Sequence, residues 1–455
     1  MRVAIIGAGI IGVTTAYELS RDGHEVTVFE RRAAAAEETS FANAGIVAPG
    51  YVTPWAAPGM PQKVLKHLFS AHGPVKLAWP LSARDLAWMW RWWRACDAGT
   101  YMATRRQLQQ LAFYSRERLH HLTHDLQLQY DRSDGFMVLL RDAQDQVMVQ
   151  PGLAVLRELG IAFHEVPGHV ARAVEPALNP DTPLVGAVHV PGDEVGNCRQ
   201  FALLLKDEAQ ALGCRFEFNT EVERIEAQPS RVWVRPRQGN GTAEAQTFDA
   251  IVLSAGVHSA ALARPLGVHI PLTAVYGHSI SMAVREDMDA PVSGVMDERY
   301  KVAISRLGQR VRVAGGAEIG GRVDRHGQRA FDTLHKVLYD WFPGSARHSR
   351  TGGQMQTWKG ARPMLPDGPP LVGASAVPGL WLALWLLGWV LCVVLSLMPS
   401  VDLPGPAYSD KVGHFLAYFM LMAWAVWIFR SRRAHLLAAL ALVALGVALE
   451  FAQAN

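Results

Sequence analysis

The stretch from residue 2 to residue 32 constrains the fold of this chain more than any other. An apolar run, Val3–Ile6, leads directly into the pattern Gly7-Ala-Gly9-Ile-Ile-Gly12, where a helical pattern begins. A second apolar run, Glu25–Phe29, follows and ends at Glu30. This order of strand, glycine-rich turn, helix and strand is typical of a dinucleotide-binding β-α-β unit. We therefore expect an α/β fold with a Rossmann-like domain.

Each glycine of this pattern has a physical role. Gly7 permits the tight turn, Gly9 lets the backbone approach a pyrophosphate, and Gly12 lets the helix pack closely on the strands. The N-terminus of that helix offers free N–H groups to phosphates. The carboxylate of Glu30 can accept hydrogen bonds from ribose hydroxyls, and an acid there argues against NADP. NAD and FAD both remain open, although a position at the N-terminus favours FAD. A nucleotide fold kept only for packing is the alternative.

Charge and cysteine content exclude several classes of protein. A net charge of +3 with 19% charged residues provides no basic field on the scale of nucleic-acid binding. The four cysteines form no C-x-x-C pair, which indicates neither a disulfide framework nor a zinc site and fits a reducing compartment. We therefore predict no nucleic-acid partner and no metal site, and the N-terminal strand does not have the pattern of a signal peptide.

The pattern after residue 61 predicts a second domain that interrupts the first. Residues 62–129 have helical patterns, and alternation in Val302–Ile304 and Val311–Val313 predicts half-exposed antiparallel strands. We expect a turn at residues 191–197 and a hairpin at residues 239–241. The buried strand 248–253 returns the chain to the nucleotide-binding sheet. The nucleotide-binding parts are expected at about residues 1–61, 199–265 and 358–382, and the substrate-domain parts at about residues 62–198 and 266–357.

A tryptophan cluster lies within the first helical stretch. Trp88, Trp90, Trp92 and Trp93 are interleaved with Arg91 and Arg94. Such a cluster is compatible with core packing or with a belt at a membrane surface. We favour core packing because tryptophan is normally highly buried.

Several blocks of sequence together resemble one enzyme family. They are VAIIGAGIIGVTTAYEL, ETSFANAG with PGYVTPWAAPGMP, DERYKVAISR, GGAEIGG and KGARPMLPDGPPLVG. In this order, from residue 1 to about 382, they resemble the small subunit of FAD-dependent D-amino-acid dehydrogenase, in the superfamily of glycine oxidase and D-amino-acid oxidase. The resemblance implies an FAD-binding domain with an antiparallel, β-rich substrate domain. It also implies that D-amino acids, typically D-alanine, are oxidised to 2-oxo acids and ammonia, with electrons passing to a membrane quinone.

The resemblance also indicates site residues. Arg362, in the G-x-R-P block, is expected to bind the substrate carboxylate, because a guanidinium binds a carboxylate in bidentate fashion. A surface ion pair is the alternative. Tyr300 is the second substrate-side candidate, with a tyrosine on a sheet face as the alternative. No catalytic side-chain base is expected, because FAD performs the difficult step. The expected FAD contacts are Ile6, Gly7, Ala8, Gly9, Ile10, Ile11, Gly12, Glu30, Arg31, Ser40, Asn43, Ala44, Gly45, Val222, Ala255 and Gly256. The small residues and hydroxyls of Glu38–Gly45, and of the Pro/Gly-rich segment that continues to Pro61, would let the backbone run close to a cofactor. From the composition of this stretch alone, a plain surface loop is the favoured interpretation.

Two departures from the family pattern stand out. Where the family commonly has K-G-Y-S, this chain has Tyr276-Gly-His-Ser279, a change that bears on substrate range. The family follows its G-L-W/Y-L strand with a glycine-rich loop that closes over the flavin. Here Gly379–Leu382 is followed directly by an apolar run.

The tail contains three apolar segments of about 15 to 18 residues, close to the length of a membrane span. They are residues 381–398, 415–429 and 435–451, and we predict three transmembrane helices. The basic loop at residues 430–433 places the flavin domain on the cytoplasmic side of the inner membrane. The blocks SLMPSVDLP, SDKVGHFLAYF and GVALEFAQ in residues 383–455 resemble part of a VanZ-like membrane protein. Asp410, Lys411 and His414 are functional or merely interfacial residues there. Two hypotheses fit the join near residue 382: a natural fusion that anchors the dehydrogenase near quinone, or a deletion or assembly join.

Overall fold

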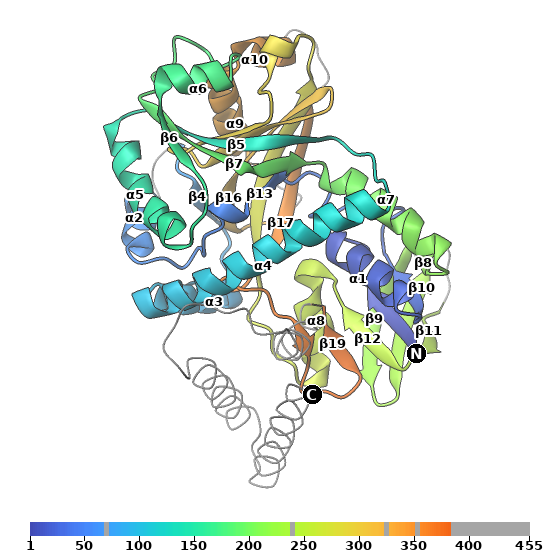
Figure 1. The fold of residues 1–455 in the computed structure, drawn as a ribbon. Coiled ribbons are helices and arrows are strands. Elements are labelled where there is room, and N and C mark those ends of the chain that lie inside the picture. Colours follow the sequence, from blue (N-terminus) through green and yellow to red (C-terminus); the bar gives the residue numbers. More distant parts are fainter. Residues whose placement is uncertain (68–71, 237–241, 323–326, 351–354, 384–455) are drawn as a thin grey trace, which may run out of the picture. The chain divides into compact units, whose positions relative to one another are not determined.

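A computed structural model describes residues 1–67, 72–236, 242–322, 327–350 and 355–383 (Figure 1). The chain divides into two compact units, Met1–Leu384 and Trp385–Asn455, and the described residues all lie in the first. The predicted transmembrane helices and the VanZ-like region therefore lie outside the described residues, apart from the start of the first helix. There the prediction is wrong, because Trp381 and Leu382 belong to strand β19 (Leu380–Leu382). None of the helices within the described ranges is long and apolar enough to span a bilayer.

The nucleotide-binding sheet has six strands gathered from distant parts of the chain. Its order is β18-β19-β12-β1-β2-β8. The strands are β18 (Gly373–Ala374), β19, β12 (Ala250–Leu253), β1 (Arg2–Ile6), β2 (Glu25–Phe29) and β8 (Arg215–Glu217). In parallel register, Ile5 pairs with Val28 on one side and with Val252 on the other. This confirms the predicted strand–helix–strand unit, and β2 has the predicted bounds.

The apolar run of β1 is buried on both faces of the sheet, as parallel sheets require. Val3 and Ile5 pack towards helices α1 (Ile10–Arg21) and α7 (Cys198–Ala211). Ala4 and Ile6 pack on the other face, in a cluster that includes residues of a three-stranded sheet. That sheet consists of β9 (Thr220–Ala227), β10 (Ser230–Pro236) and β11 (Glu244–Thr247). The hairpin expected at residues 239–241 lies outside the described residues.

The second sheet has ten strands and is mostly antiparallel, as predicted. Its main order is β17-β13-β16-β15-β14-β5-β7-β3, with β4 beside β16 and β6 beside β7. The strands are β3 (Ile46–Val47), β4 (Val75–Ala78), β5 (Arg132–Leu140), β6 (His164–Pro167), β7 (Gly186–Gly196), β13 (Thr273–Ala283), β14 (Gly294–Asp297), β15 (Val302–Leu307), β16 (Arg310–Gly320) and β17 (Gln356–Met364).

Two local predictions for this sheet are wrong. The turn expected at residues 191–197 is mostly strand, because β7 pairs with β3 and β5 along this stretch and therefore stays extended to Gly196. Strand β4 lies in the stretch read as helical, where it pairs in parallel with residues 317–320 of β16. In both places, pairing with distant segments outweighs the local pattern.

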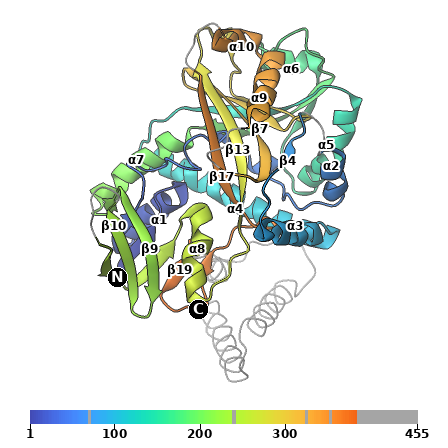
Figure 2. The same cartoon turned by 180° about the vertical axis from the view of Figure 1, so that it is seen from behind.

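Helices cover both faces of the second sheet (Figures 1 and 2). Helix α9 (Gln328–Trp341) packs on one face, where Ile280 and Val313 contact its apolar side. The long helix α4 (Ala98–Asp125) runs between the two sheets. The other helices are α2 (Met60–His67), α3 (Ala83–Ala95), α5 (Ala143–Glu158), α6 (Gly168–Val174), α8 (Ser259–Ala263), α10 (Pro343–Arg350), η1 (Pro49–Tyr51), η2 (Gly256–His258), η3 (Arg264–Leu266) and η4 (Asp287–Asp289).

A buried ionic network ties α9 to this sheet. Arg141 Nη2 lies 2.6 Å from Asp297 Oδ2 and 2.7 Å from Asp340 Oδ2. The indole N–H of Trp341 donates to Asp297 Oδ2 at 2.7 Å. Asp297 is fully buried, so its charge depends on these partners.

The tryptophan cluster only partly enters the core. Trp88 is 3% exposed, but Trp90 is 57% and Trp93 is 52% exposed. Core packing is therefore the wrong interpretation for these two residues. The reason is geometric: α3 presents one face to the sheet, and helical spacing turns Trp90 and Trp93 away from it.

Candidate functional site

The glycine turn after β1 leaves no room for side chains at two of its three glycines. Gly7 has φ +101°, and a Cβ there would lie 2.8 Å from the carbonyl oxygen of Ser254. A Cβ on Gly12 would collide with the Gly7 carbonyl and approach Ser254 Oγ to 3.0 Å. At Gly9 the nearest atom would be Ser40 Oγ at 3.5 Å, so this position is open to a close-approaching ligand.

Two polar side chains meet the start of α1. The Ile10 backbone N–H donates to Ser40 Oγ at 3.0 Å, which brings the loop at residues 40–45 to the helix N-terminus. The two oxygens of Glu30 accept from the backbone N–H groups of Ala8 and Arg32, each at 2.8 Å. Each carboxylate oxygen keeps a further lone pair, so Glu30 is fixed in place and can still accept from ribose hydroxyls.

The other side of this edge is formed by Arg31 and the segment after β12. Arg31 binds Glu38 and lies 2.8 Å from Nε2 of His258. Burial would raise the pKa of Glu38, but its hydrogen bonds and ion pairs with Arg31 and Arg32 outweigh burial and lower that pKa. Burial, together with the charge of Arg31, lowers the pKa of His258.

The structure thus gathers most of the predicted nucleotide contacts at the carboxyl end of the parallel sheet. Ser254 Oγ donates to the carbonyl of Ile6 at 2.9 Å, which places Ala255 and Gly256 beside the glycine turn. Val222 and Ala255 pack against the same apolar cluster. Ile11, another predicted contact, lies on α1 and is 41% exposed.

The loop at residues 40–45 connects this edge to the second sheet. Ser305 Oγ donates to the Ala44 carbonyl at 2.7 Å, and Arg312 donates to the Asn43 carbonyl at 3.2 Å. Gly45 has φ +71°, and its carbonyl accepts from the N–H of Gly196 at 2.7 Å. The loop therefore belongs to the site between the sheets and is more than a plain surface loop.

Arg362 lies on β17 with its guanidinium held against β13 and β16. One of its N–H groups donates to the carbonyl of Gly316 at 2.9 Å. The chain passes beneath it at Gly277, where a Cβ would lie 2.7 Å from Arg362 Cζ. Burial lowers the pKa of Arg362. Among the described residues no carboxylate lies within ion-pair distance of it, so the alternative of a surface ion pair lacks a partner there. Such a guanidinium favours binding an external carboxylate.

Arg312 is a second candidate cation, and no local sequence pattern singles it out. Its Nε donates to Ser281 Oγ at 3.1 Å, and it shares a register position with Ser305. Burial lowers its pKa to about 10, assisted by the charge of Arg310. The alternation Val311-Arg-Val313 places Arg312 on the face opposite its neighbours. Only the assembled sheet shows that this face meets the loop at residue 43.

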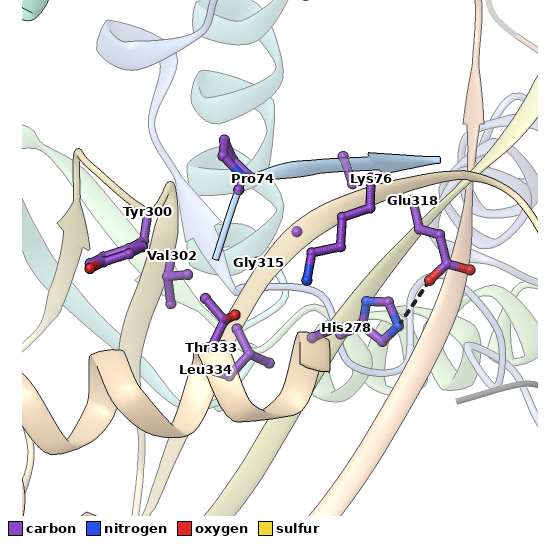
Figure 3. A pocket seen from close by; sticks show the side chains of 13 residues that line it. Pro74, Lys76, His278, Tyr300, Val302, Gly315, Glu318, Thr333 and Leu334 are labelled. Atoms are coloured by element: carbon purple, nitrogen blue, oxygen red, sulfur yellow. Dashed lines mark ion pairs between the residues drawn. The ribbon is translucent and has the colours of Figure 1, made fainter. Parts of the chain in front are cut away.

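The structure does not bring Tyr300 to Arg362. Its ring lies below the guanidinium of Arg141 (5.2 Å) and near Nζ of Lys336 (5.4 Å). It lines one end of a small cavity of about 20 Å³ beside α9, with His278 towards the other end (Figure 3). Tyr300 itself lies in the turn between β14 and β15, so it is not on a sheet face, and its role as a substrate contact stays a prediction.

The residues that depart from the family pattern contact α9 and β17. His278 packs edge-to-face on Phe331 with ring centroids 5.3 Å apart, and its Nε2 lies 3.9 Å from Glu318 (Figure 3). Lys359 lies over the ring of Tyr276 at 4.7 Å. Gly277, between the two departures, is the residue of this segment that contacts Arg362.

In the part of the chain that the structure describes, no group of three or more His, Cys, Asp or Glu side chains is arranged to hold a metal. The candidate site that the described residues form consists of a nucleotide-binding edge and two arginines, Arg312 and Arg362. Both arginines can bind anionic groups of a ligand.

Comparison with solved structures supports this fold. The crystal structure of glycine oxidase from Geobacillus kaustophilus has a TM-score of 0.61 and 19% identity, and the match covers 84% of this chain and 88% of that one. The crystal structure of iminodiacetate oxidase from Chelativorans sp. has a TM-score of 0.60 and 19% identity over 84% of this chain and 89% of that one.

Comparison of sequences gives the family. D-amino acid dehydrogenases of Cereibacter sphaeroides and Bradyrhizobium diazoefficiens are 40% and 41% identical over 385 residues, which is 84% of this chain and 86% and 89% of those proteins. Residues 2–395 match the family of FAD dependent oxidoreductases. The chain therefore belongs to the FAD dependent oxidoreductase family, whose cofactor is FAD.

Proposed function

We propose that this protein is a D-amino acid dehydrogenase, which oxidises D-amino acids, D-alanine in particular, to 2-oxo acids and ammonia. The observation that carries this proposal is Arg362, a guanidinium with no carboxylate partner among the described residues. The high identity to D-amino acid dehydrogenases over 385 residues supports the substrate class.

The residues at the edge of the nucleotide-binding sheet fit FAD. Gly9 leaves open space where a pyrophosphate approaches the start of α1. Glu30 is held by two backbone N–H groups and retains acceptor capacity for ribose hydroxyls. The loop at Asn43, which Arg312 joins to the second sheet, would help to hold the cofactor at this edge.

The chain's own residues bind and orient the substrate. Arg362 would bind the carboxylate, and its hydrogen bond to Gly316 fixes the plane of the guanidinium. FAD, when bound, accepts the hydride from the α-carbon. Loss of that hydride and of an amine proton gives an imino acid, and water hydrolyses it to the 2-oxo acid and ammonia. No side chain of the described site needs to act as a base, so the contribution of the protein is position and exclusion of water.

We also propose that the electrons pass to a membrane quinone and that the protein resides at the inner membrane, with its flavin domain on the cytoplasmic side. The three apolar segments of the tail and its VanZ-like sequence support this proposal. A natural fusion would place the dehydrogenase beside the quinone pool. A deletion or assembly join would give a flavin domain without its closing loop.

Two alternatives compete with this proposal. The fold is shared with glycine oxidase and iminodiacetate oxidase, so another amino-acid or amine substrate is one. An inert flavin domain on a membrane protein is the other, because the glycine-rich loop expected after Leu382 is missing from the sequence.

The test is the visible spectrum of the detergent-purified full chain, recorded before and after anaerobic addition of substrate. Flavin bands that bleach with D-alanine and not with L-alanine support the proposal. Bleaching by glycine or a secondary amine in preference to D-alanine would favour the first alternative. A colourless protein that stays colourless after addition of FAD would favour the second.

A further inference from the structure

Helix α3 and the loop before it leave an aromatic and cationic face exposed. Its apolar residues are Trp79 (76% exposed), Leu86 (54%), Trp90 (57%) and Trp93 (52%). The rings of Trp90 and Trp93 lie 4.9 Å apart and form one continuous patch. The exposed residues Arg84, Arg91 and Arg94 lie on the same helix. We call these seven residues the α3 face.

The opposite side of α3 is anchored to the second sheet. The indole N–H of Trp88 donates to the carbonyl of Met364 at 2.9 Å, and Thr273 Oγ1 donates to Asp85 at 2.8 Å. Ser82 and Asp85 form a capping box at the helix N-terminus. Trp90 and Trp93 therefore stand on a fixed helix and not on a fraying segment.

The charge of the α3 face is positive. None of its three arginines has a carboxylate within ion-pair distance in the described part of the chain. Asp85, the acid within α3, is engaged by Ser82 and Thr273. Asp97, the next acid along the chain, caps α4 through the N–H of Thr100 at 2.9 Å.

Tryptophan beside unpaired arginine is the chemistry of a membrane interface. The indole ring prefers the headgroup level of a bilayer, and arginine binds lipid phosphates while its stem lies along apolar surface. We propose that the α3 face binds the surface of a bilayer that contains anionic phospholipids.

Charge argues against the two other occupants of this face. A second copy docked face to face would bring the same arginines together across a two-fold axis. Residues 384–455 carry four Lys or Arg and three Asp or Glu, so they supply no excess of negative charge.

Membrane binding at the α3 face would also bring the protein to a membrane quinone. Only this link to quinone rests on the proposed function. Trp88 binds the β17 carbonyl two residues from Arg362, and it packs on Val275, the register partner of Arg362. A bilayer bound at the α3 face therefore lies next to the substrate-binding strand.

The experiment uses the full chain in phosphatidylcholine vesicles with and without phosphatidylglycerol. An environment-sensitive fluorophore is attached at Trp90→Cys, in a chain whose native cysteines are replaced by alanine. The matched control carries the label at Met148→Cys on α5, a position that is 44% exposed. The readout is quenching by lipids brominated in their acyl chains, which is independent of enzyme activity. Circular dichroism verifies that both labelled chains are folded.

We expect several-fold stronger quenching at residue 90 than at residue 148, and only when the anionic lipid is present. Arg91→Gln with Arg94→Gln should lower the docking constant about fivefold per arginine. The proposal is overturned if the label at residue 90 is no more quenched than the control. The proposal is also overturned if the label at residue 90 is shielded from aqueous iodide but is not quenched by the lipids. Shielding that depends on protein concentration would then indicate a second copy as the occupant. Shielding that is independent of protein concentration would indicate residues 384–455.

Discussion

A single methyl group at Gly277 should displace the anchor for the substrate carboxylate. In Gly277→Ala the new Cβ would lie 2.7 Å from Cζ of Arg362, closer than side-chain carbons are found to other atoms. The backbone at this position needs no left-handed conformation, and the obstructing group is the far end of a flexible side chain. The guanidinium should therefore move while the fold remains, and its hydrogen bond to Gly316 should be lost.

The displaced guanidinium should also lose one of its hydrogen bonds to the substrate carboxylate. A hydrogen bond to a charged group contributes about 1.5–3 kcal/mol. Loss of this amount in the transition state lowers kcat/KM for D-alanine about 10- to 100-fold. The free energy of unfolding should fall by no more than about 1.5–3 kcal/mol, because the bond from Arg362 to Gly316 is lost and no buried apolar contact is removed.

The assay is a double-mutant cycle of Gly277→Ala with Arg362→Gln, measured as kcat/KM with an artificial electron acceptor. If Gly277→Ala acts through Arg362, its effect should disappear in the Arg362→Gln background. Gly152→Ala, in α5 with no atom near the added methyl group, is the control that should leave kcat/KM unchanged. Additive losses in the cycle, or an unchanged kcat/KM for Gly277→Ala alone, would refute the assignment of Arg362.

Three further predictions address the cofactor, the core and pH. Gly12→Val should abolish bound flavin, read as the ratio of visible to ultraviolet absorbance, because its side chain collides with the Gly7 carbonyl; retained flavin would contradict the packing argument. Arg141→Met should lower the free energy of unfolding in urea by about 3–5 kcal/mol, because it leaves the buried Asp297 carboxylate without its cation; a loss below about 1 kcal/mol would contradict this. Burial raises the pKa of the Asp193 carboxyl from 3.8 to about 6. Between these two pH values the folded state therefore keeps a proton that the unfolded state releases. Stability should therefore fall as pH rises between about 4 and 6, and Asp193→Asn should flatten this slope in urea titrations; an unchanged slope would assign it to other groups.

The sequence predicted well those features that depend on local pattern. The β1–α1–β2 unit follows from apolar runs and glycine spacing, and its strands lie where expected. The positions of Glu30 and the three glycines at the carboxyl edge of this unit also follow from the motif, because each depends on the local backbone and its nearest neighbours. Arg362 was found through family resemblance alone, because no local pattern distinguishes it from other arginines.

The features that the sequence missed depend on distant segments. Arg312 faces the loop at Asn43 only because β16 and β15 carry it there. Trp90 and Trp93 have the composition of core residues, and their exposure follows from which face of α3 meets the sheet. Strand pairing likewise extends β7 through a stretch with strong turn signals. Local patterns contain no information about such partners.

The order of strands in the nucleotide-binding sheet also constrains how the protein reaches its native state. Strand β12 pairs with β1, from the start of the chain, and with β19, near residue 381. During synthesis the sheet therefore cannot be completed until nearly the whole first unit has left the ribosome. Until then one edge of β12 is open to pairing with another chain. Because pairing between such distant segments must first close a long loop, we expect this sheet to form late and slowly.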